Sequence, residues 1–174
     1  PIIVIAAVGV FLEPYRRDRI LAFSDPFADS SNTGYQIVQS LIALGSGKTT
    51  GTGLGAGKAK WLFLPNAHTD FIFSIIGEEL GLVGSLSVVL LFVAFILLGI
   101  RIVLSCKDRF AALMATGIVA WIGGQAIINL MAVIGLLPVS GITLPFVSFG
   151  GSSLLISLGA AGILANIART STTK

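Results

Sequence analysis

Charged residues are scarce in this sequence. Of its 174 residues, 11% are Asp, Glu, Lys or Arg, against about 25% in an ordinary soluble domain. Apolar residues make up 55% of the chain, and the mean hydropathy is +0.97. So few charges do not cover the surface of a soluble domain of this length, which excludes a soluble globular fold. We expect lipid to be the solvent for most of the chain.

Cysteine and histidine occur once each, as Cys106 and His68. A single cysteine excludes an intrachain disulfide. A single histidine without a second histidine or cysteine nearby disfavours a zinc-type site, so stabilising a turn is the simpler role for His68. The sequence also shows neither an initiator Met nor a signal peptide, because an apolar run is already under way at Pro1. We therefore expect residues 1–12 to be the end of a transmembrane helix.

Three long apolar runs dominate the rest of the chain. A helix needs about 20 residues to cross a bilayer, and the runs predict transmembrane helices over residues 70–104, 111–137 and 152–168. Helices are expected because open strands leave backbone groups unsatisfied in lipid. The predicted fold class is therefore an all-α polytopic membrane protein, a multi-span helical bundle.

Basic residues in the short connections predict the orientation in the membrane. The connection 105–110 with its flank and the tail 169–174 carry five of them, whereas residues 138–151 carry no charge. Cytoplasmic connections are enriched in Lys and Arg, so 105–110 and 169–174 are predicted to be cytoplasmic. Residues 138–151 and 13–69 then form extracytoplasmic loops. Six basic residues in 13–69 run against this rule, from which long loops are largely exempt.

The segment 13–69 is too long for a passive connector. Apolar residues at helical spacing over 35–44 predict a short amphipathic helix that lies on the membrane surface, with caps or a turn at 29–32. Gly47-Lys48-Thr49 resembles the end of a phosphate-binding P-loop. That motif requires a glycine five residues before Gly47, where the sequence has Ile42. Nucleotide binding is therefore disfavoured.

Asp70 stands where the long loop meets the next apolar run. Continued as a helix, small and polar residues fall within about 60° of it, since each residue advances by 100°: Ser74, Gly77, Gly81, Gly84 and Ser85. Such a face indicates close helix packing in membranes, so Asp70 is predicted to face the bundle interior. A helix N-cap, which contributes about 1 kcal/mol, is an equally good interpretation of Asp70. The two roles are compatible.

Other polar residues interrupt the predicted spans. Helical spacing places Glu78 about 80° from Asp70 and Glu79 on the side opposite Asp70, so the two are not predicted to share one role. Pairing with a loop Arg or Lys, or solvation at the interface if the helix protrudes, is favoured over a chemical role. A polar stripe recurs every four residues in the second full span: Gly117, Trp121, Gln125 and Asn129. Interhelical hydrogen bonding is the favoured role of this stripe, ahead of substrate contact. Ser152 lies in a Ser- and Gly-rich run at a helix start, which predicts either simple capping or an anion site.

The order of motifs along the chain resembles the SEDS family of FtsW, RodA and SpoVE. The resemblance covers nearly the whole chain and corresponds to the C-terminal part of the family's bundle. Its clearest segments are Gly34-Tyr35-Gln36, Ala43-Leu44-Gly45-Ser46-Gly47, Ala67-His68-Thr69-Asp70-Phe71, Gly77-Glu78-Glu79-Leu80-Gly81, Gly135-Leu136-Leu137-Pro138 and Ser148-Phe149-Gly150-Gly151-Ser152-Ser153. Residues 57–66 look more like the division branch than the elongation branch. Lys48-Thr49-Thr50 departs from the pattern, since relatives usually carry another glycine and apolar residues there.

The resemblance implies a peptidoglycan glycosyltransferase that polymerises lipid II on the outer face of the bacterial cytoplasmic membrane during cell division. Asp70 matches the family's essential acidic residue, and a carboxylate at this place would act as a general base. The leaving pyrophosphate needs cations, and a divalent ion, Mg or Mn, would share that task. The expected substrate-binding residues are Arg16, Arg19, Lys58, Lys60, His68 and Ser152.

The resemblance also implies a class B penicillin-binding protein and division proteins as partners, together with membrane lipids and no nucleic acid. A polypeptide of this length is expected to be inactive without the other half of the family's membrane domain. Two other functions stay open. A lipid II flippase would need a polar path through the bilayer, whereas the charges here cluster at the predicted outer surface. A non-catalytic scaffold would keep its activity when Asp70 is replaced by alanine.

Overall fold

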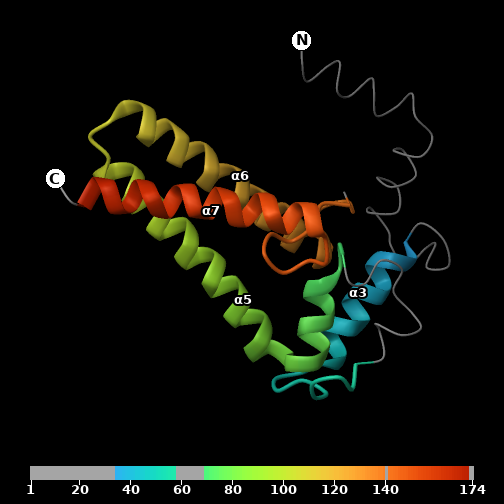
Figure 1. Cartoon of the computed structure of the whole chain (residues 1–174). Helices are drawn as coiled ribbons and strands as arrows, with labels where there is room; N and C mark the ends of the chain where they lie inside the picture. Colours follow the sequence, from blue (N-terminus) through green and yellow to red (C-terminus); the bar gives the residue numbers. More distant parts are fainter. Residues whose placement is uncertain (1–33, 58–68, 140, 173–174) are drawn as a thin grey trace, which may run out of the picture.

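The computed structural model describes residues 34–57, 69–139 and 141–172, which form four helices. They are α3 (Tyr35–Ser46), α5 (Ile72–Ser105), α6 (Arg109–Val133) and α7 (Gly151–Thr172) (Figure 1). The last three are long and apolar enough to cross a membrane. This confirms the predicted all-α membrane fold. The helix end predicted at 1–12 and most of the loop 13–69 lie outside the described residues.

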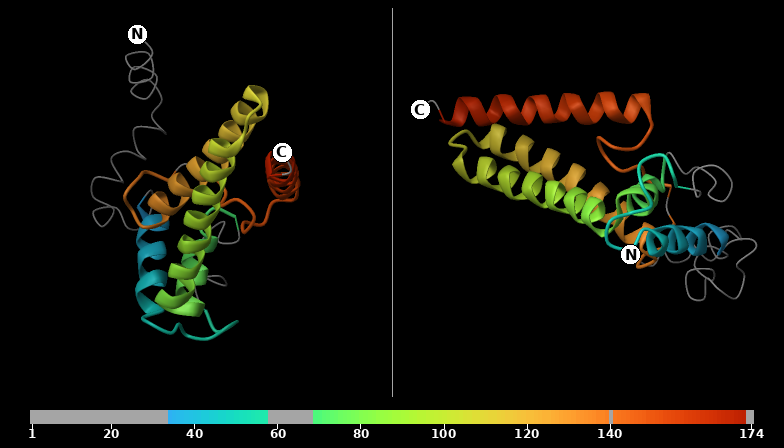
Figure 2. Two further views of the ribbon diagram at one scale, coloured as in Figure 1. Left: turned by 90° about the vertical axis from the view of Figure 1, so that its left-hand side faces the viewer. Right: turned by 90° about the horizontal axis from the view of Figure 1, so that it is seen from below.

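Helices α5 and α6 form an antiparallel hairpin, and α7 runs back along it (Figure 2). The hairpin turns at Asp108, whose carboxylate accepts hydrogen bonds from the backbone N–H groups of Phe110 and Ala111, each at 3.2 Å. This cap satisfies donors that the first turn of α6 leaves free. A Cβ at Gly99 would overlap the side chain of Val119, so the missing side chain lets α5 and α6 approach closely.

The helix bounds differ from the sequence prediction mainly at the ends of α6 and α7, and α7 continues to Thr172 instead of ending at residue 168. The predicted span continued to residue 137, whereas α6 ends at Val133. Two residues later Gly135 has a φ of 75°, in the left-handed region that glycine adopts without strain. A glycine in this conformation commonly ends a helix. Residues 135–139 and 141–150 are therefore irregular, and α7 begins at Gly151.

The amphipathic pattern of α3 had predicted a helix that lies on the membrane surface. In the structure, α3 packs against α5 and α6. Its buried face carries Ile37, Val38 and Ala43, whereas Ile42 is 55% exposed. The helix starts after Gly34, whose carbonyl accepts from the N–H of Val38 at 3.0 Å, and no side chain caps it. The caps predicted at 29–32 lie outside the described residues.

A buried hydroxyl pair joins α3 to the other helices. Ser40 Oγ donates to the carbonyl of Val133 at 2.7 Å and lies 2.6 Å from Ser74 Oγ. A hydroxyl has one proton, so Ser74 is the donor to Ser40. Both serine side chains are fully buried.

Replacing Ser40 with alanine is expected to lower the free energy of unfolding by about 1–3 kcal/mol, because a buried hydroxyl and a carbonyl lose their partner. The melting temperature of the full-length protein in detergent measures this loss. Ser87→Ala is the matched control, since Ser87 Oγ donates to Val83 O at an exposed position. Equal melting temperatures for both variants would contradict the prediction.

Helix α5 is broken at Gly81, where φ is 66° and ψ is −158°. In a continuous helix, the N–H groups of Leu82 and Val83 would donate to the carbonyls of Glu78 and Glu79. The break separates these groups and leaves two donors and two acceptors without their helical partners. Figure 1 shows the resulting corner, at which the short first part of α5 runs beside α3.

The segment 47–53, here named the clip, binds all four of these backbone groups. The N–H groups of Leu82 and Val83 donate to the clip carbonyls of Lys48 (2.9 Å) and Thr49 (3.3 Å). In return, clip N–H groups donate to the two freed carbonyls: Thr52 to Glu78 at 2.9 Å and Gly53 to Glu79 at 3.1 Å. The clip thus replaces the missing helical hydrogen bonds in the break.

The clip resolves two features of the sequence. Its Gly-Lys-Thr run uses its backbone to bind the break in α5 and opens no helix, which agrees with the rejection of a P-loop. The uniform helical face predicted from Asp70 to Ser85 is wrong beyond Gly81, because the break redirects every later side chain.

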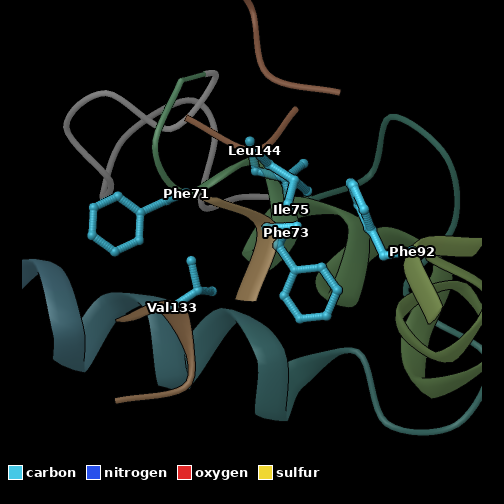
Figure 3. Packing of buried hydrophobic residues seen from close by; sticks show 7 residues of the cluster. Phe71, Phe73, Ile75, Phe92, Val133 and Leu144 are labelled. Atoms are coloured by element: carbon cyan, nitrogen blue, oxygen red, sulfur yellow. The ribbon is translucent and has the colours of Figure 1, made fainter. Parts of the chain in front are cut away.

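An apolar cluster packs beside this corner. It joins residues from both parts of α5, from α6 and from the connection to α7: Phe71, Phe73, Ile75, Phe92, Ala126, Val133 and Leu144. Figure 3 shows Phe71 and Phe73 above α3, with Leu144 and Phe92 close by. The cluster fixes the start of α5 relative to the connection 134–150, and these two segments carry the candidate site.

Candidate functional site

Asp70 lies in the turn that precedes α5. The N-cap of this helix is Phe71, and no side chain makes a capping hydrogen bond there. The interpretation of Asp70 as a helix cap is therefore wrong. Its side chain is partly exposed, and among the described residues its carboxylate is in no hydrogen bond or ion pair. The carboxylate is thus available for chemistry with a bound molecule.

The backbone around Asp70 is held by two side chains. Asn129 of α6 donates through Nδ2 to the carbonyl of Asp70 at 2.9 Å and to the carbonyl of Ile142 at 2.6 Å. Ser148 donates to the carbonyl of Thr69 at 2.6 Å and accepts from the N–H of Leu144 at 2.7 Å. Two consecutive carbonyls before α5 are therefore tied to the connection between α6 and α7.

The Asp70 carboxylate faces Gly141. A Cβ placed on Gly141 would lie 3.7 Å from Asp70 Oδ2, and the φ of Gly141 is 70°. Glycine adopts this left-handed conformation without strain. Apart from its chain neighbours, no other atom of the described residues lies within 4 Å of that Cβ position, so the missing side chain leaves room beside the carboxylate.

The polar stripe of α6 was predicted to form hydrogen bonds with another helix. Its hydrogen bonds go mainly to the connection between α6 and α7 instead. Gln125 Nε2 donates to the carbonyl of Thr143 at 2.9 Å, and Thr143 Oγ1 lies 3.2 Å from Ser153 Oγ of α7. Trp121 is 46% exposed. The sequence marked Asn129 as polar within a span. Its contact with Asp70 was not predictable, because it depends on where α6 ends.

A groove of about 550 Å³ starts at Gly141 and runs along α6. Its walls are mostly apolar, and they come from α6 and the connection after it: Ala120, Trp121, Gly124, Gln125, Ile128, Gly141, Ile142 and Thr143. A lipid-linked molecule whose polar part lies near Asp70 would have an apolar surface beside it.

The remaining predicted site residues are not brought to Asp70 by the described structure. Ser152 is exposed in the first turn of α7, where the hydroxyl contact to the connection comes from Ser153 instead. Arg16, Arg19, Lys58, Lys60 and His68 lie outside the described residues, so their predicted role in substrate binding stays a prediction.

The carboxylates of Glu78 and Glu79 both lie beside Gly57, although helical spacing predicted that they would not share one role. A Cβ built on Gly57 would lie 2.9 Å from Glu78 Oε2 and 3.1 Å from Glu79 Oε1. Glu78 is 5% exposed and Glu79 is half-buried. They lie on the last turn before the break, next to Gly57.

The donor set around Asp70 does not by itself fit a resident metal ion. Within residues 34–57, 69–139 and 141–172, no three His, Cys, Asp or Glu side chains come together in a way that could hold one. Divalent cations need several oxygen ligands, and Asp70 alone supplies too few.

Comparison with known proteins gives one consistent result. The family described as cell cycle proteins, FtsW/RodA/SpoVE, matches residues 1–173. The chain is 52% identical to the "Probable peptidoglycan glycosyltransferase FtsW" of Geobacter metallireducens, over 88% of this chain and 41% of that protein. It is 47% identical to the "Stage V sporulation protein E" of Bacillus subtilis, over 94% of this chain and 45% of that protein.

A solved structure shares the fold. A chain from a peptidoglycan synthase complex, whose polymerization and crosslinking are described as structurally coordinated, matches with a TM-score of 0.76 and 29% identity. The match covers 99% of this chain and 47% of that one, so the chain spans about half the length of these relatives. The chain belongs to the FtsW/RodA/SpoVE family of cell cycle proteins, which are multi-pass proteins of the bacterial cytoplasmic membrane.

Proposed function

We propose that the full-length protein polymerises lipid II into peptidoglycan glycan strands during cell division. The observation that carries this proposal is the Asp70 carboxylate, which the helix does not use and which faces open space at Gly141. The relatives named as peptidoglycan glycosyltransferases support the activity. Their names as FtsW support the role in division.

The proposed reaction joins two lipid-linked sugars. The 4-hydroxyl of one sugar attacks the anomeric carbon of the other, the bond to the lipid pyrophosphate breaks, and the hydroxyl proton passes to Asp70. A carboxylate within hydrogen-bond reach of the hydroxyl contributes about 10²–10⁴-fold as a general base. The groove along α6 would take the apolar chain of a substrate bound in this way.

The leaving pyrophosphate gains negative charge as its bond breaks, and cations stabilise that charge. We propose Arg16, Arg19, Lys58, Lys60 and His68 for this task, with Ser152 at the N-terminus of α7 as a further contact. A divalent cation, Mg or Mn, is proposed only as an ion carried by the pyrophosphate. Loss of polymerisation after chelation with EDTA, and its return with added Mg or Mn, tests this part.

A class B penicillin-binding protein is the proposed partner. The peptidoglycan synthase complex that contains the matching fold supports an assembly of this kind. Such a partner would couple the crosslinking of strands to their polymerisation, and the complex of the two proteins is the form to be assayed.

The test uses the purified full-length protein with its penicillin-binding partner, lipid II and detergent, followed by separation of glycan products by length. Polymer formation by the wild-type complex supports the proposal. If lipid II instead crosses the bilayer of reconstituted vesicles without being polymerised, the protein is a flippase. If neither occurs, while the partner becomes active only when bound, the protein is a scaffold.

A further inference from the structure

We infer that Asn129 is a positioning residue that sets the location of the Asp70 carboxylate. This inference rests on the proposed function, because the carboxylate needs a fixed location only if it acts on substrate. Asn129 is buried, its amide N–H groups bind two carbonyls, and its Oδ1 has no hydrogen-bond partner among the described residues.

The amide of Asn129 connects the two segments that flank the candidate site. Its two N–H bonds go to two carbonyls, that of Asp70 itself at 2.9 Å and that of Ile142 at 2.6 Å. Ile142 follows Gly141, the residue that the Asp70 carboxylate faces. A single side chain therefore joins the backbone of Asp70 to the backbone next to Gly141.

The orientation of this amide is determined by its partners. With Oδ1 and Nδ2 exchanged, an oxygen would face two carbonyl oxygens, so only the observed orientation forms hydrogen bonds. In this orientation Asn129 Oδ1 is buried without a hydrogen-bond partner among the described residues, and the residue is only 2% exposed. A buried acceptor without a partner is unfavourable, so packing alone does not explain an asparagine here. Holding the two carbonyls does.

Nothing else among the described residues holds the Asp70 carbonyl. The N-cap of α5 makes no side-chain hydrogen bond, and Ser148 binds the preceding carbonyl, that of Thr69. Removing the Asn129 amide would release the Asp70 peptide while α5 and the apolar cluster around Phe71 stay in place. A displacement of a catalytic group by about 1 Å can lower a rate by about 10²-fold.

The first test measures polymerisation by the full-length complex with Asn129→Ala and with Asn129→Ser. The serine side chain is shorter than that of asparagine, so its hydroxyl does not reach the two carbonyls. We expect kcat to fall by about 10- to 100-fold, with little change in the KM for lipid II. Ser40→Ala is the comparison variant, because Ser40 binds another buried carbonyl of α6, that of Val133, without touching Asp70 or the groove. Its loss of kcat should be at least several-fold smaller. Equal losses for Ser40 and Asn129 variants of equal melting temperature would overturn the inference.

The second test locates residue 70 without using activity. In a full-length background in which every native cysteine, Cys106 included, is replaced by serine, Asp70→Cys and Gly141→Cys place two thiols on neighbouring residues, since Asp70 Oδ2 lies 3.7 Å from the Gly141 Cβ position. We expect rapid disulfide formation with copper phenanthroline, and at least fivefold slower formation after adding Asn129→Ala. An unchanged rate would overturn the inference whether or not the protein polymerises lipid II. A wild type that makes no polymer, with crosslinking slowed as expected, would reject the proposed function and keep the positioning role.

Discussion

Asp70→Asn in the full-length protein is expected to lower kcat for lipid II polymerisation by about 10²–10⁴-fold, the usual contribution of a general base. Asparagine has nearly the same shape, so the backbone hydrogen bond from Asn129 to residue 70 remains. It cannot accept the proton of the attacking hydroxyl. Because binding of the substrate does not need this proton transfer, KM should change little. Product length and rate, measured on the complex with its penicillin-binding partner, provide the check.

Asp108→Asn is the matched control for this experiment. It removes one carboxylate at the opposite end of α6, where Asp108 caps the helix through two backbone N–H groups. Asparagine caps helices about as well as aspartate, so polymerisation should stay near the wild-type rate. If Asp70→Asn and Asp108→Asn polymerise equally well, Asp70 is not the base, and the proposed chemistry must use another residue.

Gly81→Ala is expected to destabilise the full-length protein by about 3 kcal/mol or more. The φ of 66° and ψ of −158° at this position are accessible almost only to glycine. An added Cβ would also overlap Gly51 N and lie 2.7 Å from the carbonyl of Thr49, both in the clip. The melting temperature in detergent and the yield of monodisperse protein measure the effect.

Gly45→Ala is the control, because a Cβ at Gly45 meets no atom within 4 Å and α3 is helical there. Alanine is favoured over glycine in a helix by about 1 kcal/mol, so this variant should be no less stable than the wild type. Gly51→Ala should resemble Gly81→Ala, since its Cβ would overlap the Glu79 carbonyl across the same contact. The double variant should then lose less than the two single losses together. Fully additive losses would mean that the clip and the break are independent.

The transmembrane helices were predictable because membranes impose a simple rule on sequence. Long apolar runs must become helices, and α5, α6 and α7 occupy the three runs. The break in α5 was not predictable from that rule. Gly81 looked like one of several small residues on a packing face, and only the clip, more than 25 residues earlier in the chain, makes the broken conformation favourable.

The candidate site was predictable in part. The resemblance pointed to Asp70, but spacing alone supported helix capping equally well, and the structure removes that alternative because Phe71 is the N-cap. Asn129 was placed in an interhelical network, since a polar residue in a span usually bonds to a neighbouring helix. Its actual partners are two loop carbonyls. Their location depends on the end of α6 at Val133, four residues before the end that the sequence predicted.

The clip has a consequence for the natural variation of this protein. It binds the break in α5 mainly through main-chain atoms, and the side chains of Thr49 and Thr50 are exposed. Substituting either threonine leaves the main-chain hydrogen bonds in place. An inserted or deleted residue would instead move each donor past its acceptor, because four bonds on both sides of the break depend on one register. Among homologous genes, we expect this segment to vary freely in residue type at these positions and to keep a constant length.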